Sequence, residues 1–429
     1  MRKVPLTLVA ILAASSAWAD LTLEDALRSA RANNGTVQAA YLNYRAAVAQ
    51  ERASYAAFLP TVTPTVRQEN GRLNNFTGLG RGGSTIDATE AGVTASWLIL
   101  DNGTRATNYR SAGLVRDQAE FSALDTLRNV LFNVHLSFYN ALRAQELLIV
   151  QTSGVRRAKE ILDRAILSEE VGAGPKKDIL QARADYLNAQ VGELTAQNQV
   201  STSRSSLWAV IGYSEPEIPK LVGPGEQDPQ LSLPTLEEAT EQALRDRADL
   251  RAARIGIESS EAAVDTARLA GSFSYSLSAQ YNRSFSESVF DRSGIVLEAS
   301  FPLYDGSRSK ERVTGAKLDL ESRRKSYDQS VRVAIAEIES AWKEQSQNAE
   351  RIRASRIARD AALLNYEAAT EARRLGAGEL IEELTARLSL VTAESNLVQA
   401  VYDYWISDVR FRLASGRPLP GEESEEETP

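Results

Sequence analysis

The feature that constrains this chain most is a motif that it contains twice. VGAGPKKDILQAR begins at Val171, and LGAGELIEELTAR begins at Leu375, 204 residues later. Asp101 and Asp305, each within a short turn-forming stretch, are separated by the same 204 residues. Such long-range self-similarity predicts two copies of one supersecondary plan, although the length of 429 residues alone suggests two or three unrelated domains.

The two copies differ in length at one place. TLED at Thr22 recurs as TLEE at Thr235, 213 residues on, so the first copy holds nine extra residues before Asp101. The polar and glycine-rich stretch 74–87 is the natural site for them, and we expect it to be a flexible outer loop. Its GLGRGG segment, which begins at Gly78, has the spacing of a dinucleotide-binding fingerprint, but no helix follows it, so we reject that interpretation.

Each copy has the same predicted order of helix, two strands, long helix, tip and return helix. The strands show period-two alternation, and the helices show 3.6-residue periodicity. In the first repeat, 20–211, we expect a helix at 22–57, strands at 60–72 and 88–100, a long helix at 103–171 and a return helix at 176–211. In the second repeat, 235–415, we expect a helix at 235–270, strands at 272–285 and 292–304, a long helix at 306–374 and a return helix at 379–415.

The first long helix carries coiled-coil seams. One heptad line is apolar throughout, with a shorter companion line and a third line of small residues. The first consists of Leu127, Val134, Ala141, Leu148, Val155 and Leu162, the companion of Leu124, Leu131 and Phe138, and the small line of Ala123, Val130, Ser137, Ala144, Ala158 and Ala165. Seams on two sides predict neighbours on two sides, as in a wall of helices about 100 Å long at 1.5 Å per residue.

The repeated GAG stretches separate two helices each time. Glycine suits the residue just after a helix, and proline suits the first position of the next, where we place Pro175. The echoed motifs are therefore predicted to be hairpin tips, far from the strands.

The N-terminal residues predict that the chain is exported across the inner membrane. Residues 1–19 have a basic start, a short apolar run and a small-x-small cleavage site, as in a signal peptide. The proline-rich stretch 212–234 is predicted to be a linker, and 416–429 an acidic, solvated tail. After the signal peptide no run of 18 apolar residues follows, so we expect no transmembrane helix.

Composition excludes several functions. The net charge of −8 gives no reason to expect nucleic-acid binding. The chain has no cysteine and one histidine, His135, which we expect to be a packed residue rather than a catalyst. Catalytic triads and zinc sites therefore have little support. We expect no enzyme activity, no cofactor, and no catalytic or metal-binding residues.

Four amphipathic strands are too few for one closed barrel. In lipid every backbone group needs a partner, and the smallest common bacterial barrel has about eight strands. Two or three chains would therefore pool strands, giving eight or twelve. The alternative is a soluble four-stranded sheet. The signal peptide and the very long helices argue against it, as do the aromatic residues near the strand ends, Trp97, Tyr281 and Phe301.

The duplicated marks resemble the TolC family of outer-membrane efflux and secretion channels over essentially the whole mature chain. They are LTLEDAL from Leu21, ASYAAFLPTVTPTV from Ala53, FPLYDGSRSKERVTGA from Phe301 and the two GAG tips. The resemblance implies a mixed α and β membrane protein with two structural repeats per chain. It implies a homotrimer whose twelve-stranded transmembrane β-barrel, set in outer-membrane lipid, continues into a long periplasmic α-helical barrel. It also implies an exit duct of a tripartite efflux pump or type I secretion system. Its partners would be a periplasmic adaptor and an inner-membrane transporter of the RND or ABC type.

The resemblance also implies roles for individual residues at the tips. Asp178 matches a position in the closed tip, and we expect it to pair with Arg373 or Arg374, although Gly378 stands where the family has an arginine. Glu382 matches a ring of acids at the tunnel mouth, whose second acid is replaced here by Thr385. The candidates for the gate and tunnel mouth are Asp178, Arg373, Arg374, Glu379, Glu382 and Glu383, and those for adaptor docking are Gly172, Gly174, Gly376 and Gly378.

Glu379, Glu382 and Glu383 fall within one helical turn, where Glu379 should share a face with each of the other two. Three copies of Glu382 around one axis would favour cations.

Two other classes of protein remain open. A soluble periplasmic coiled-coil scaffold or adaptor would share the long helices and tips, but it has no use for apolar strand residues such as Phe273, Tyr275 and Leu277. A diffusion porin would need many more strands in one chain.

Overall fold

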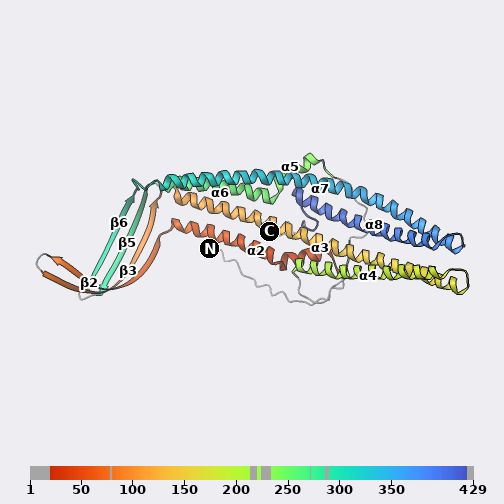
Figure 1. The fold of residues 1–429 in the computed structure, drawn as a ribbon. Helices are drawn as coiled ribbons and strands as arrows, with labels where there is room; N and C mark the ends of the chain where they lie inside the picture. The colour runs from red at the N-terminus through yellow and green to blue at the C-terminus, as the bar shows by residue number, and fades with distance from the viewer. Residues whose placement is uncertain are drawn as a thin grey trace. The chain divides into compact units, whose positions relative to one another are not determined.

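The computed structural model describes residues 20–77, 80–212, 220–223, 233–270, 272–285 and 289–422. The predicted signal peptide, 1–19, and most of the predicted linker lie outside these residues. Figure 1 shows the helices and strands with the labels used below.

The chain forms two compact units that do not follow its two repeated halves. The helical unit contains Met1–Gln38, Leu127–Glu241 and Glu337–Pro429, and the sheet unit contains Ala39–Thr126 and Gln242–Ala336. Each half gives its strands to one unit and its tip helices to the other. The sequence repeat is thus a repeat of supersecondary structure rather than of independent domains.

The sheet unit contains one antiparallel sheet. Its strands are β2 (Thr61–Thr77), β3 (Gly80–Leu100), β5 (Ser274–Phe285) and β6 (Val289–Ser300), in the order β2-β3-β5-β6. Within the described residues, β2 and β6 each pair with one neighbour only. Both outer strands therefore leave one edge of backbone donors and acceptors without a strand partner.

The prediction of a flexible outer loop at 74–87 is wrong. β2 and β3 stay paired through this stretch, up to Thr77 opposite Gly80. A ladder uses backbone groups alone, so polar and glycine-rich sequence can continue it once the flanking strands have set the register. The second hairpin is shorter, since its pairing runs only from Ser274 opposite Ser300 to Phe285 opposite Val289. β6 also ends earlier than we predicted, at Ser300, so Phe301 and Leu303 lie beyond it.

Apolar side chains line up across all four strands. Val62, Ala95, Ala279 and Ile295 stand opposite one another in turn, and the next row on the same face holds Trp97, Leu277 and Leu297. Ile295 and Leu297 are 77% and 66% exposed. A monomeric soluble protein seldom leaves such a contiguous apolar face in water.

Each predicted opening helix is in fact two helices. The first is α1 (Leu23–Asn33) and α2 (Gly35–Tyr55), followed by a single 3₁₀ turn, and the second is α5 (Leu236–Asp246) and α6 (Ala248–Leu269). Asn34 is extended at φ −69° and ψ 119°, and its side chain accepts hydrogen bonds from the amides of Thr36 and Val37. Arg247 is extended in the same way at φ −62° and ψ 126°. The apolar periodicity continues across both breaks, which is why it does not reveal them.

Two pairs of long helices follow the strand hairpins. The first pair is α3 (Thr104–Glu170) and α4 (Lys176–Ile211), and the second is α7 (Arg308–Arg374) and α8 (Leu380–Ser415). The repeated aspartates start the long helices in the same way. Asp101 Oδ2 accepts the amide of Arg105 at 2.7 Å, and Asp305 Oδ2 accepts the amide of Ser309 at 2.8 Å. An aspartate here satisfies amides that have no partner inside the helix.

The core of the helical unit lies where the seams of α3 meet α1, α4 and α8. Most of its α3 members come from the predicted heptad lines, with Leu131, Val134, Phe138 and Ala141 almost fully buried. Tyr139 and Leu142 join them from outside those lines. A short parallel pair that we did not predict, β1 (Asp20–Leu21) with β4 (Lys220–Leu221), adds Leu21 and Leu221 to this core.

The start of the tail is packed rather than solvated. Leu419 is buried in the same core, and Glu422 pairs with Arg128 at 2.9 Å. The apolar Leu419 anchors the chain there, which brings Glu422 within reach of the arginine. The remaining tail residues, 423–429, lie outside the described residues.

His135 is a core residue of the helical unit. It is fully buried on α3, and its Nε2 lies 3.2 Å from the carbonyl oxygen of Pro420. Burial lowers the pKa of His135 to about 4, and the nearby charge of Arg412 acts in the same direction, against the hydrogen bond to Pro420. The imidazole is therefore neutral in the folded chain at neutral pH.

This burial predicts a loss of stability in acid. Below the ordinary pKa of 6.5 the unfolded chain takes up a proton that the folded chain refuses until about pH 4, so stability falls across that window. We expect about 2 kcal/mol less unfolding free energy per chain at about pH 5 than at about pH 7.5. Unfolding of the purified protein in detergent, followed at both pH values, measures it. A His135→Gln variant should show a smaller drop, and an equal drop would contradict the assignment.

Candidate functional site

The two tips have the same backbone construction. Gly172 and Gly376 have positive φ angles of 72° and 76°. Ala173 N donates to Ser168 O at 2.8 Å, and Ala377 N donates to Ala372 O at 2.9 Å. These bonds satisfy carbonyls at the ends of α3 and α7, which is how a left-handed glycine closes a helix.

The other two tip glycines lie where a side chain would be crowded. A Cβ on Gly174 would lie 2.7 Å from Ser168 Oγ, and a Cβ on Gly378 would lie 3.2 Å from Ala372 Cβ. Pro175 takes the N-cap position of α4 rather than the first helical position that we predicted. Gly172 and Gly376 therefore close the long helices, and Gly174 and Gly378 keep the backbone at the tips close together.

An ion pair joins the two tips. Arg373 Nη2 at the end of α7 lies 2.6 Å from Asp178 Oδ2 on the first turn of α4. The Asp178 side chain is 9% exposed, and Arg373 Nη1 also donates to the carbonyl of Gly378 at 3.4 Å. Of the two arginines expected as partners, Arg373 makes the contact. Arg374 instead pairs with Glu371 on its own helix, where its hydrogen bonds lower the pKa of Glu371.

The three glutamates after the second tip have different surroundings. Glu379 is the N-cap of α8 and forms a capping box with Glu382, and both are exposed. Glu383 is buried and accepts a hydrogen bond from Arg164 of α3. Glu379 is exposed and Glu383 turns into the helical unit, so these two carboxylates do not lie together at the surface.

Further charged pairs continue behind the tips, and sequence reasoning missed them. Arg387 Nη2 of α8 lies 2.5 Å from Asp185 Oδ1 of α4, and Arg157 Nη2 of α3 lies 2.6 Å from Glu394 Oε2 of α8. Seven residues separate Arg157 from Arg164, Asp178 from Asp185, and Arg387 from Glu394. That heptad spacing of charges was a signal available in the sequence, since such residues fall on one helix face.

Comparison with known protein families identifies the family of the chain that forms these tips. The outer membrane efflux protein family matches residues 26–213 and 239–417, which are most of the chain and include both tips. The chain belongs to the outer membrane efflux protein family. Its members are channels rather than enzymes. The chain is accordingly an outer-membrane efflux duct with a periplasmic portion, and a soluble scaffold or adaptor is not favoured.

Individual proteins agree with the family. Protein CyaE of Bordetella pertussis is 25% identical over 351 residues, which are 80% of this chain and 72% of CyaE. Nodulation protein T of Rhizobium leguminosarum bv. viciae is 24% identical over 419 residues, 94% of this chain and 84% of that protein. The crystal structure of the CmeC outer membrane channel of Campylobacter jejuni superposes with a TM-score of 0.83 at 19% identity, covering 94% of this chain and 87% of CmeC.

No helix in the described ranges is both long and apolar enough to cross a membrane. The same residues contain no cluster of three or more histidine, cysteine, aspartate or glutamate side chains suited to a metal ion.

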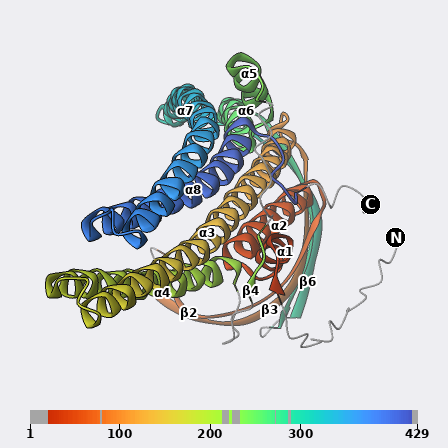
Figure 2. The ribbon, with the colours of Figure 1, turned by 90° about the vertical axis from the view of Figure 1, so that its right-hand side faces the viewer.

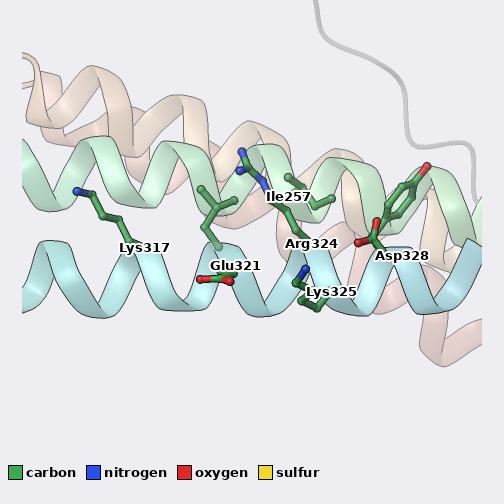
Figure 3. Close-up of a pocket in the computed structure, with 8 residues that line it drawn as sticks. Ile257, Lys317, Glu321, Arg324, Lys325 and Asp328 are labelled. Atoms are coloured by element: carbon green, nitrogen blue, oxygen red, sulfur yellow. The ribbon is translucent and has the colours of Figure 1, made fainter.

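The groove between α6 and α7 in the sheet unit is not a comparable site of this efflux protein. Figure 3 shows Ile257 of α6 beside charged side chains of α7, which include both signs. Arg324 there is paired with Glu261 at 2.6 Å. The groove thus presents no single-sign surface that would select a ligand.

The Arg387–Asp185 pair should be the most costly of the tip pairs to break. The two side chains are 3% and 11% exposed, and within the described residues Arg387 Nε and Asp185 Oδ2 make no hydrogen bond. Removing one member of a buried pair typically costs about 3–5 kcal/mol, because the other charge stays buried. Breaking an exposed pair costs about 0–1 kcal/mol.

We therefore expect Arg387→Ala to lower the unfolding free energy strongly, and Arg374→Ala, at an exposed pair, hardly at all. Denaturant unfolding of the two variants in detergent makes the comparison. A double variant, Arg387→Met with Asp185→Leu, should recover most of the loss. Equal stability of the two single variants would show that the buried pair has no special weight.

Proposed function

We propose that three copies of the chain close a twelve-stranded barrel in the outer membrane. The observation that carries this proposal is the sheet of four strands, with an exposed apolar face and unpartnered edges on β2 and β6. In hydrocarbon an open edge costs several kcal/mol per unpaired group, so edges must meet edges. Three chains bring twelve strands, an even number within the bacterial range.

The same three copies give a periplasmic tunnel of helices that opens at the tips. Such a duct needs no energy source of its own, because the inner-membrane transporter supplies it. We infer that a periplasmic adaptor binds the tips, in a tripartite efflux pump or a type I secretion system. Gly172, Gly174, Gly376 and Gly378 are the docking candidates, since narrow tips allow close approach of a partner helix.

The Asp178–Arg373 pair is the proposed latch of the closed tips. It joins α4 to the end of α7, and it lies partly exposed at 27% for the arginine side chain. Asp178 is nearly buried and Arg373 is partly exposed, so breaking this pair costs more than breaking a surface pair. It costs less than breaking the Arg387–Asp185 pair, whose arginine side chain is only 3% exposed. A binding partner would offset that cost when it releases the latch. The buried Arg387–Asp185 pair lies seven residues further from the first tip on α4, where it would keep the hairpins together while the tips move.

Charge reversal at the latch tests the proposed function. Asp178→Arg places two arginines together, so the closed tips should separate and the single-channel current of the protein in a planar bilayer should rise. Arg374→Gln is the matched control, because Arg374 is exposed and paired within its own helix. An Asp178→Arg channel with the closed conductance of the wild type would contradict the latch, and a wild-type protein that never carries current would contradict the duct.

Glu382 is the proposed acid of the tunnel mouth. It is exposed at the start of α8, and three copies around one axis would attract cations. Glu382→Gln should lower the preference for cations over anions, measured as the reversal potential in a salt gradient across a bilayer. Glu339→Gln removes the same charge from an exposed position on α7 that pairs with Lys343. An equal shift in both variants would reject a local role of Glu382.

A further inference from the structure

The sheet unit has a belt of aromatic and apolar side chains at the end where its strands join the helices. Phe273 and Phe301 stack there, with ring centroids 4.3 Å apart. Trp97 is 43% exposed, and Leu303 and Tyr304, just past β6, are 92% and 87% exposed. Figure 2 shows the strands β2, β3 and β6 in one curved layer. Aromatic residues of this kind gather where hydrocarbon meets water, so this belt marks the periplasmic boundary of the proposed barrel.

A run of basic side chains begins directly after this belt. Arg308, Lys310 and Arg312 lie in the first five residues of α7, which starts at the end of the sheet where β6 stops (Figure 1). All three side chains are exposed, and none makes an ion pair within the ranges that the structure describes. Three cations are thus accessible four to eight residues after Tyr304.

The acidic residues nearby do not cancel this charge. The Asp305 carboxylate caps α7 by accepting hydrogen bonds from the amide and the hydroxyl of Ser309, and the positive end of the helix dipole offsets its charge. Glu311 is the only acid in the first turn of α7. On α6, Asp265 is paired with Arg268 at 3.1 Å. The start of α7 therefore keeps a net positive charge.

The plan that the two repeats share does not require these cations. At the offset of 204 residues that relates Asp101 to Asp305, the three basic positions correspond to Thr104, Ala106 and Asn108 of α3, which are all neutral. Both aspartates start their helices with the same amide hydrogen bond. The basic residues of α7 are thus not needed to begin a long helix, which points to an interaction outside the chain.

The depth of these residues matches a layer of lipid headgroups. A bilayer has about 30 Å of hydrocarbon within a total of about 40–45 Å, which leaves roughly 5–8 Å of headgroups on each side. A helix rises about 1.5 Å per residue, so the stretch from Arg308 to Arg312 spans at most about 6 Å. Long basic side chains can also turn back toward the interface. All three cations can therefore reach the headgroups next to the belt.

We propose that Arg308, Lys310 and Arg312 bind the headgroups of anionic phospholipids in the leaflet of the outer membrane that faces the periplasm. The arginine forks bind phosphate oxygens in pairs, and the lysine adds a point charge. Leu303 and Tyr304 then lie against the acyl chains of the same lipids. The inference rests on the proposed barrel and gives it a lipid partner, which fixes the depth of each copy in the membrane.

Quenching of Trp97 fluorescence by brominated lipids measures this preference. Trp97 is the one tryptophan of the sheet unit, and a Trp97→Phe variant supplies the signal of the others for subtraction. The purified protein is reconstituted in phosphatidylcholine vesicles that contain brominated phosphatidylglycerol or brominated phosphatidylcholine at equal mole fractions. A basic residue near an anionic lipid surface favours it roughly fivefold. The association constant should therefore be at least about fivefold higher for phosphatidylglycerol.

Two triple variants separate the proposed site from general charge. The test variant combines Arg308→Gln, Lys310→Gln and Arg312→Gln, and it should bring the ratio of the two association constants close to one. The control variant combines Arg323→Gln, Lys325→Gln and Arg332→Gln, which removes the same charge from exposed positions of α7. These positions lie about 20 Å or more from the start of the helix, beyond the headgroups, so the control should keep the wild-type ratio.

Salt gives a second test that needs no variant. Ions screen the attraction between exposed charges, so the wild-type ratio should fall as salt rises from about 0.05 to 0.5 M. A ratio that stays constant would contradict binding through these cations. Inorganic phosphate, compared with chloride at equal ionic strength, should leave the ratio unchanged. A ratio that phosphate alone abolishes would mean that the residues bind free phosphate rather than lipid.

The same measurement distinguishes failure of this inference from failure of the barrel. Equal quenching of the wild type by both brominated lipids, or an equal loss of preference in the two triple variants, would overturn the lipid site. The barrel would then still stand, because quenching itself shows that Trp97 lies in lipid. A wild-type protein whose Trp97 neither lipid quenches would overturn the barrel and this inference with it.

Discussion

An antiparallel sheet with two open edges and an exposed apolar face is the constraint on which the rest of the structure depends. β2 and β6 each have one strand neighbour in the described sheet, and the row from Val62 to Ile295 is apolar across all four strands. Water would penalise the face, and lipid would penalise the edges. Insertion into lipid removes the penalty on the face, and the pairing of edges between the three proposed copies removes the penalty on the edges. In that proposed assembly the long helices would line one shared tunnel.

The helical unit holds its two hairpins together by charge as well as by apolar packing. The burial of the arginine increases from Arg373 at the tips, whose side chain is 27% exposed, to Arg387 behind them, whose side chain is 3% exposed. A buried charged pair adds little net stability over an apolar one, but it penalises every arrangement that separates its members. A less buried pair carries a smaller penalty. The gradient fits the proposed gate, in which the tips part while the helices behind them stay together.

Much of the fold could be predicted from local signals. The two GAG motifs located the tips, and heptad lines such as Leu131, Val134 and Phe138 located buried surface on α3, because periodicity and glycine act over short distances. The breaks at Asn34 and Arg247 could not be found this way, since the apolar pattern runs through them. The strand pairing up to Thr77 was hidden by a loop-like composition, because ladder hydrogen bonds need no particular side chain. Of the candidate site, Asp178 could be paired with an arginine through the family resemblance. The partners of Glu383 and Arg387 depend on how separate helices rotate against one another, which one sequence does not reveal.

The central claim is that the pore is a shared object to which each chain gives one third. Its most direct test is the protein mass of the purified particle in detergent, by light scattering, together with the ionic current of the same sample in a planar bilayer. Our account predicts a particle of three chains that conducts ions. A single-chain particle that stays soluble without detergent and carries no current would contradict it.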